Sequence, residues 1–170
     1  MSRILGIDPG VNGAIALIDT ETWTLSVTDM PREPGKGGKN AVSPAGVARI
    51  MDAVAPDYVV IEDVWSSPQM GVVSAFSFGR NLGILEGAAA ARSIMTKVRP
   101  QDWKAATKTP KDKNEARRRA MQLFPCAYDL FVRVKDDGRA EAALLCFYGL
   151  LALLKQPPPQ PLTLTEFPTL

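Results

Sequence analysis

The sequence ILGIDPGVNGAIALI, residues 4–18, sets the pattern on which the rest of this 170-residue chain is built. Its first four residues form a short apolar run of the kind that makes a buried strand. Asp8-Pro9-Gly10 is a turn signal, and a second apolar run starts at Ala14. The pattern predicts a β-hairpin whose first strand ends in the carboxylate of Asp8. Such a carboxylate needs a hydrogen-bond partner, an ion pair or a cation, although an aspartate also caps turns of this kind.

A second carboxylate follows a second apolar run. Residues 58–61 are continuously apolar, which is typical of a central strand that is covered on both faces, and Glu62 comes directly after them. Parallel neighbouring strands end at the same edge of a sheet, so we expect Asp8 and Glu62 to lie side by side. Two carboxylates this close repel each other, and both ionise readily only when a cation lies between them.

Two more acids open the last predicted helix. Asp137 and Glu141 are four residues apart in KDDGRAE, and hence on one helix face. If the apolar residues of that helix pack on the sheet, the pair reaches the same edge as Asp8. Acidic residues also simply suit a helix N-terminus. Four oxygen ligands, in a chain without histidine, favour Mg²⁺ or Mn²⁺ over zinc, and two such ions would suit phosphodiester cleavage.

The order of predicted elements defines the fold class. After the hairpin come a third strand (22–28), a helix (44–55), the strand at 58–61, a helix (72–93), a strand (95–98) and further helices. The first three strands form an antiparallel meander, and the last two need helical crossovers and so run parallel to the first. The sequence therefore predicts an α/β, ribonuclease H-like fold: a five-stranded mixed sheet with helices on both faces. Residues 31–40 are predicted to be a mobile basic loop.

Length and composition predict one domain, residues 1–155, followed by a proline-rich tail, residues 156–170. The longest apolar run, 142–154, is too short to span a bilayer, and an aspartate interrupts the first apolar run, so we expect no membrane segment and no signal peptide. The isolated Cys126 and Cys146 favour a reducing cytoplasm. The absence of histidine excludes Ser-His-Asp catalysis and the usual zinc sites.

Positive charge is concentrated in one segment. The net charge is only +2, but residues 99–139 hold eleven Lys and Arg against six Asp and Glu. A basic segment on a nearly neutral chain indicates a nucleic-acid partner. A solvated helix face is the alternative interpretation.

Five motifs, taken together and in order, resemble RuvC-type Holliday-junction resolvases, especially their bacteriophage and prophage branch. They are ILGIDPGVNGAIALID, VVIEDVW, GRNLGILEGAAAA, VRPQDWKAA and KDDGRAEAALL, and they span nearly the whole chain. The resemblance implies a homodimeric endonuclease of the cytoplasm of a bacterial or phage-infected cell. Such an enzyme nicks two opposed strands of a four-way DNA junction and uses two Mg²⁺ or Mn²⁺ ions per active site.

The resemblance also implies roles for particular residues. The catalytic metal ligands would be Asp8, Glu62, Asp137 and Glu141. The cellular enzymes carry two aspartates at closer spacing where this chain has Glu141, so Asp136 stays an alternative to Asp137, which is favoured because it shares a face with Glu141.

Other residues of the resemblance would contact DNA. They are Lys104, Lys111 and Lys113, which would bind phosphates, and Met70, in a region from which the family inserts an apolar side chain into the junction. We expect Phe76 and Trp103 to be packing residues and Glu86 to be structural. The helix at 72–93, rich in small residues, is predicted to pair with its two-fold copy.

Alternatives remain open at this stage. A ribonuclease H-like nuclease for other branched or hybrid nucleic acids would have the same fold and metals, and a non-catalytic scaffold would keep only the binding surface. An actin-like ATPase would need two such domains. In the tail, residues 160–164 distantly resemble peptides that dock on the sliding clamp. The tail could instead be disordered, or could pack on the domain through Leu162, Leu164 and Phe167.

Overall fold

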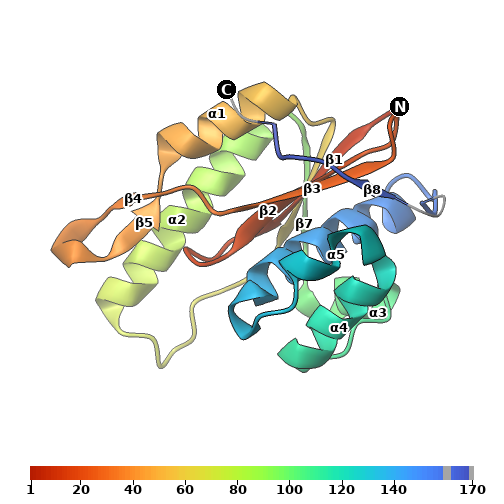
Figure 1. The fold of residues 1–170 in the computed structure, drawn as a ribbon. Coiled ribbons are helices and arrows are strands. Elements are labelled where there is room, and N and C mark those ends of the chain that lie inside the picture. The colour runs from red at the N-terminus through yellow and green to blue at the C-terminus, as the bar shows by residue number, and fades with distance from the viewer. Residues whose placement is uncertain (159–161, 169–170) are drawn as a thin grey trace.

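A twisted mixed sheet lies at the centre of the computed structural model, which describes residues 1–158 and 162–168. β1 (Arg3–Asp8), β2 (Ala14–Asp19) and β3 (Thr24–Asp29) form an antiparallel meander. β6 (Tyr58–Glu62) and β7 (Ile94–Val98) continue the sheet beyond β1, and both run parallel to it. This is the predicted arrangement of three antiparallel and two parallel strands (Figure 1).

The predicted number of five strands is wrong by one. A sixth strand, β8 (Thr163–Leu164), pairs parallel to β3 at the sheet edge. A two-residue strand inside a proline-rich tail is too short to show an alternating pattern, and this explains why the sequence did not reveal it.

Helices cover both faces of the sheet, as predicted (Figure 1). α1 (Pro44–Val54) and α2 (Val72–Ala90) share a core with one set of strand residues, among them Leu5, Ile7 and Ile61. α5 (Asp137–Ala152) shares the other core with the alternate residues, including Ile4 and Val60. α3 (Pro100–Ala106) and α4 (Lys113–Leu123) pack beside α5, and the 3₁₀ turns Pro125–Leu130 and Val134–Asp136 lead into it. No helix in the described ranges has the length and apolar character needed to cross a bilayer.

Two glycines let α5 lie directly on the sheet. A Cβ atom added to Gly6, in the middle of β1, would overlap the carbonyl oxygen of Ala142 and lie 2.5 Å from the backbone nitrogen of Cys146. A Cβ added to Gly149 would lie 2.7 Å from the Ile4 side chain. Because the first obstacles at Gly6 are backbone atoms, the helix could not yield there by a simple rotamer change.

The segment after β3 is a hairpin and not the predicted loop. β4 (Arg32–Pro34) pairs antiparallel with β5 (Asn40–Val42), and a 3₁₀ turn (Lys36–Gly38) joins them. The glycines that suggested a mobile loop occupy the turn, where Gly37 and Gly38 have φ of 71° and 76°. Left-handed backbone of this kind is what glycine adopts without strain.

The tail crosses the edge of the sheet and touches both cores. Leu162 is buried in the core on the α5 side, and Phe167 packs against the core on the α1 side. Between them, the Thr163 N–H donates to the Trp23 carbonyl at 3.1 Å and the Thr165 N–H to the Leu25 carbonyl at 3.0 Å. Gln160 and Pro161, part of the segment that resembles a clamp-docking peptide, lie outside the described residues.

The close contact at Gly6 predicts that one added methyl group strongly lowers the stability of the fold. Gly6→Ala should lower the free energy of unfolding by about 1–3 kcal/mol or more, because overpacking against backbone forces α5 away from β1. Gly71→Ala, at the N-cap of α2, is the control: no atom lies within 4 Å of its would-be Cβ, and its effect on the free energy of unfolding should stay below about 1 kcal/mol. Urea unfolding followed by circular dichroism measures both, and equal stabilities would contradict the close approach.

The tail contacts predict that Leu162 and Leu164 contribute differently to the stability of the fold. Leu162 is 4% exposed and Leu164 is 38% exposed. Leu162→Ala should cost about 2 kcal/mol or more through the lost burial and the cavity, and Leu164→Ala should cost no more than about 0.5 kcal/mol. Thermal unfolding of the two variants and of a chain truncated after Gln156 provides the test. An unchanged melting temperature for Leu162→Ala would mean that the tail does not pack on the body.

Candidate active site

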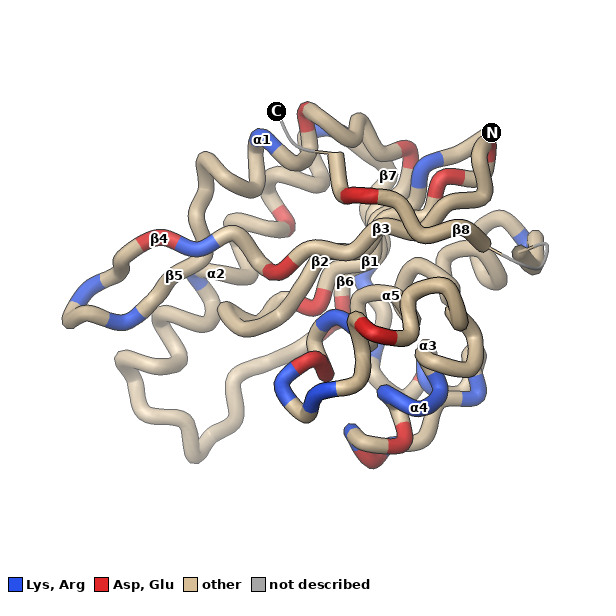
Figure 2. The backbone as a smooth tube through the Cα atoms, viewed as in Figure 1, with Lys and Arg blue, Asp and Glu red and all other residues tan. Residues whose placement is uncertain are grey.

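An open pocket of about 920 Å³ lies where β1 and β6 end, facing the first turn of α5. Its charged lining is mixed in sign, and all four predicted acids contribute to it. The acidic side chains are Asp8, Glu62, Asp136, Asp137 and Glu141, with Asp29 at the side, and the basic ones are Arg32, Lys104, Lys113, Lys135 and Arg139. Figure 2 shows acidic and basic positions interleaved at the start of α5.

Asp8 is the most perturbed acid of the pocket. Burial, together with the negative charges of Glu141 and Glu62, raises its pKa from 3.8 to about 7, and a hydrogen bond donated by the Gly10 N–H offsets only part of this rise. An Asp8 carboxylate is therefore poorly stabilised by the protein alone at neutral pH. A positive charge bound in the pocket would remove that penalty.

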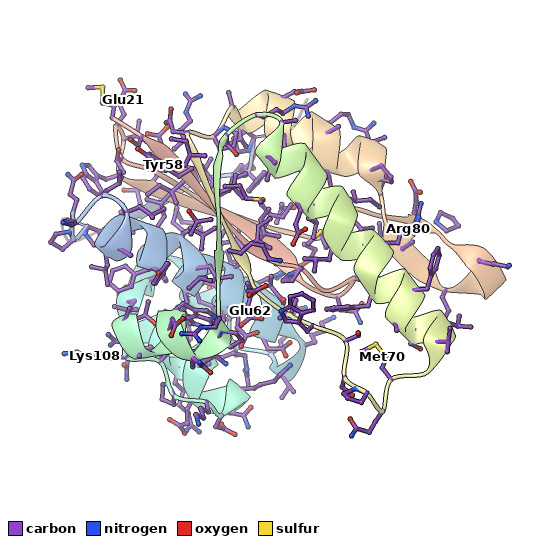
Figure 3. All side chains as sticks on the ribbon, turned by 180° about the vertical axis from the view of Figure 1, so that it is seen from behind. Glu21, Tyr58, Glu62, Met70, Arg80 and Lys108 are labelled. Atoms are coloured by element: carbon purple, nitrogen blue, oxygen red, sulfur yellow. The ribbon has the colours of Figure 1, made fainter. Side chains whose placement is uncertain are left out.

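Glu62 is oriented by a tryptophan. Burial raises the pKa of Glu62, and Glu141 adds to the rise, whereas a hydrogen bond from Trp103 opposes it. The Trp103 indole N–H donates to Glu62 Oε1 at 2.8 Å, and the ring is fully buried. The expectation that Trp103 packs in the core is confirmed. Its hydrogen bond to Glu62, which lies in the middle of Figure 3, was not predicted because it joins residues far apart in the chain.

The other two acids are each paired with a lysine. Lys113 Nζ lies 2.6 Å from Asp137 Oδ2, and Lys104 Nζ lies 3.2 Å from Glu141 Oε1. The hydrogen bond to Asp137 raises the pKa of Lys113. Two ammonium groups thus neutralise part of the acidic cluster. Lys111, the third predicted lysine, is exposed and does not line the pocket.

Asp136 is bound by the protein itself. It is buried, its carboxylate accepts hydrogen bonds from the Arg133 backbone and guanidinium at 2.8–3.2 Å, and Arg139 lies 3.7 Å away. Burial would raise its pKa, but the hydrogen bonds from Arg133 outweigh burial and lower it. Asp137 lies in the first turn of α5, one turn before Glu141. The geometry therefore favours Asp137 over Asp136 as the third ligand.

Gly138 is a site residue that the sequence reasoning missed. A Cβ atom there would lie 2.9 Å from Asp8 Oδ2 and 2.9 Å from the Gly13 Cα. Only a glycine lets the first turn of α5 approach the β1–β2 turn this closely. The available signal was a glycine near the start of an otherwise helical pattern.

The donor set suits a hard divalent cation. Every acidic group of the pocket offers carboxylate oxygens, the ligands that Mg²⁺ and Mn²⁺ prefer. In the described ranges no three Asp, Glu or Cys side chains converge closely enough to hold one ion as they stand. With Lys113 and Lys104 engaged by Asp137 and Glu141, closure around a cation requires these two carboxylates to exchange partners.

The loop after β6 leaves apolar groups in solvent. Trp65 is 82% exposed, Phe76 is 73% exposed, and the neighbouring Val72 and Val73 are also exposed, so the expectation that Phe76 packs in the core is wrong. Met70 is half-buried on the loop that leads from Glu62 to α2 and does not line the pocket (Figure 3).

A lysine next to this loop forms ion pairs with two acidic residues. Lys97, on β7, lies 2.8 Å from Glu86 on α2 and 3.0 Å from Asp63, the residue after Glu62. Its ammonium group also lies 5.7 Å from the centre of the Trp65 ring. These contacts connect α2 to the chain beside the acidic cluster, in keeping with a structural role for Glu86.

Comparison with known proteins identifies the architecture. No family model and no curated protein matches the chain. A solved structure described as "T. thermophilus RuvC in complex with Holliday junction substrate" covers 89% of this chain and 97% of its own, with a TM-score of 0.58 and 17% identity. The Thermus thermophilus RuvC structure matches with a TM-score of 0.59 and 17% identity, covering 91% of this chain and 97% of its own. The chain has the RuvC fold. The predicted ribonuclease H-like class is thereby confirmed.

The perturbed aspartate in this RuvC fold predicts a pH-dependent stability. Asp8 in the unfolded chain ionises near pH 4 but in the folded protein only near pH 7, so the unfolded state binds fewer protons in this range and stability falls as pH rises through it. About three pH units correspond to about 4 kcal/mol. Asp8→Asn removes the penalty.

The measurement is thermal unfolding in EDTA from pH 4 to pH 8. The melting temperature of Asp8→Asn should exceed that of the unmodified protein, and the difference should grow as the pH rises and become constant above pH 7. Added Mg²⁺ should then raise the melting temperature of the unmodified protein at pH 8 and leave Asp8→Asn nearly unchanged. An Asn variant that is no more stable at pH 8 would contradict the assigned burial of an unpaired carboxylate.

Proposed function

We propose that this chain is a metal-dependent endodeoxyribonuclease that resolves four-way DNA junctions by paired nicks. One observation carries the proposal: four carboxylates from β1, β6 and α5 surround a single open pocket with two lysines, in a RuvC fold. The solved RuvC that shares the fold is in complex with a Holliday junction substrate. The predicted bacteriophage and prophage branch, and the cytoplasmic location, remain parts of this proposal.

The residues proposed to hold two Mg²⁺ or Mn²⁺ ions are Asp8, Glu62, Asp137 and Glu141. Bound ions of this kind activate a water molecule and stabilise the leaving oxygen in phosphodiester hydrolysis. Trp103 holds Glu62 in one orientation through its 2.8 Å hydrogen bond, and is thus a positioning residue. The Gly10 N–H does the same for Asp8.

The two pocket lysines have a second proposed role. Lys104 and Lys113 neutralise Glu141 and Asp137 in the structure. If cations replace them as counter-charges, their ammonium groups become available to the phosphate oxygens of the substrate, where charge develops during cleavage. Lys111, exposed just before α4, and Met70 on the loop after β6 are proposed to contact the DNA outside the pocket.

A homodimer fits the surface of α2. This helix buries Asn81, Leu85 and Ala89 against its own domain. On other faces its glycines at 79, 83 and 87 have no atom within 4 Å of a would-be Cβ, and Val72, Val73 and Phe76 are exposed. Apolar groups at this density are costly in water. A two-fold copy packed here would cover them and give two active sites for two opposed strands.

Docking of the tail on a sliding clamp would compete with the packing of the tail on its own domain. Leu162 is buried, and Thr163 and Leu164 pair with β3. The peptide would have to leave the sheet before it could bind a partner.

Cleavage assays with matched variants test the proposed activity. Purified protein with Mg²⁺ should nick a labelled four-way junction symmetrically and leave linear duplex and RNA–DNA hybrid largely intact. Asp8→Asn should lower the rate by at least 100-fold because it loses a metal ligand, while junction binding in EDTA stays within a few-fold. Preferred cleavage of the hybrid would support a ribonuclease H activity. Junction binding without cleavage by the unmodified protein would support a scaffold.

The dimer is tested by an exposed aromatic residue. Phe76→Asp should convert the protein to a monomer at micromolar concentration, because it places a charge in an apolar interface. Light scattering measures the mass, and Arg49→Asp, on the exposed surface of α1, is a control that should leave the dimer intact. Symmetric cleavage by an unmodified protein that scatters as a monomer would rule the interface out.

A further inference from the structure

The hairpin formed by β4 and β5 is a basic projection that starts at the active-site pocket. Arg32, its first residue, lines the pocket and is exposed. Lys36 and Lys39 are exposed at the other end. Figure 2 shows the hairpin extending away from the body of the protein with basic positions at its tip.

The base of this hairpin is firmly held. Val42 is completely buried, and its N–H donates to the side-chain oxygen of Asn81 on α2 at 3.2 Å. The Ser43 N–H donates to the Pro31 carbonyl at 2.9 Å, and near the tip the Gly35 N–H donates to the Lys39 carbonyl at 2.7 Å. These hydrogen bonds fix the hairpin on the domain, and so they fix the position of the backbone that bears the tip charges.

The chemistry of the tip selects the kind of partner. Residues 35–40, GKGGKN, contain no apolar side chain that could form the core of a protein interface. Neither tip lysine forms an ion pair with any residue that the structure describes. Lys104 and Lys113, by contrast, are matched by Glu141 and Asp137. Two ammonium groups without ion-pair partners among the described residues, next to glycines that leave the backbone accessible, are suited to binding a polyanion.

The reach of the hairpin matches a nucleic-acid duplex. A strand rises roughly 3.3 Å per residue, so Lys36, in the turn after β4, lies at most roughly 13 Å beyond Arg32. Duplex DNA carries about one phosphate charge per 1.7 Å of its axis. A duplex whose scissile strand lies in the pocket would therefore present phosphates along the whole length of the hairpin.

We propose that the β4–β5 hairpin is a DNA-binding arm whose Lys36 and Lys39 hold the phosphate backbone of one duplex arm of the substrate outside the active site. This inference rests on the proposed function, since it takes branched DNA as the ligand of the adjoining pocket. It assigns substrate binding to a segment that lies outside the basic region at 99–139.

The test compares two variants that each lose two positive charges. Lys36→Gln with Lys39→Gln removes the tip charges. The control, Arg49→Gln with Lys155→Gln, removes two exposed charges from α1 and from the segment that follows α5, away from the pocket. Binding to a labelled four-way junction is measured by fluorescence anisotropy in EDTA at several salt concentrations. A linear duplex of the same length is measured in parallel, and light scattering gives the mass of each variant.

The expected result is a change in salt dependence for the hairpin variant alone. Its plot of log affinity against log salt should be flatter than that of the unmodified protein by about 1.8, or about 0.9 per lost phosphate contact, and the control should keep the original slope. Equal slopes in the two variants would overturn the inference. A hairpin variant that becomes a monomer would also overturn it, because the hairpin would then be a subunit contact.

The affinities of the unmodified protein for junction and for linear duplex test the proposed function independently of the hairpin. If the unmodified protein shows no preference for the junction over linear duplex, the proposed function fails. In that case a flatter slope of the hairpin variant on linear duplex still supports the DNA-binding arm, and an unchanged slope overturns it.

Discussion

The direct contact of α5 with β1 is the constraint on which the site depends. Gly6 removes the side chain that would separate the helix backbone from the strand, and Gly138 does the same where the helix begins. With the helix this close, Asp137 and Glu141 face the pocket in which β1 ends at Asp8. The acidic cluster thus depends on backbone packing as well as on the acids themselves, because the two glycines allow α5 to bring Asp137 and Glu141 close to Asp8.

That packing brings several carboxylates together, and lysines of the chain partly neutralise their charge. Burial and mutual repulsion make an ionised Asp8 unfavourable, as its pKa near 7 expresses. Lys104 and Lys113 pair with two of the acids of the cluster, Glu141 and Asp137. A site of this kind is costly to the fold when its counter-charge is missing. Sites that bind charged ligands often trade stability in this way.

Strong periodic patterns explain what the sequence predicted well. Apolar runs that end at Asp8 and Glu62 indicated strands and placed both acids at one edge, and the apolar run of the last helix brought Glu141 to them. Weaker signals failed for physical reasons. The hairpin at 32–42 and the strand at 163–164 are too short to show periodicity, and residue type alone did not reveal that Phe76 is exposed. The hydrogen bond from Trp103 to Glu62 depends on tertiary packing that no local pattern records.

The crossing of the sheet edge by residues 162–168 has a consequence for synthesis. Until β8 pairs with the start of β3, the outward backbone groups of Thr24 and Leu25 are free to pair with another chain. On the ribosome β3 emerges long before β8 does. The nascent protein therefore carries these unpaired groups on β3 until β8 emerges, and in that interval neighbouring chains on one messenger could associate through them.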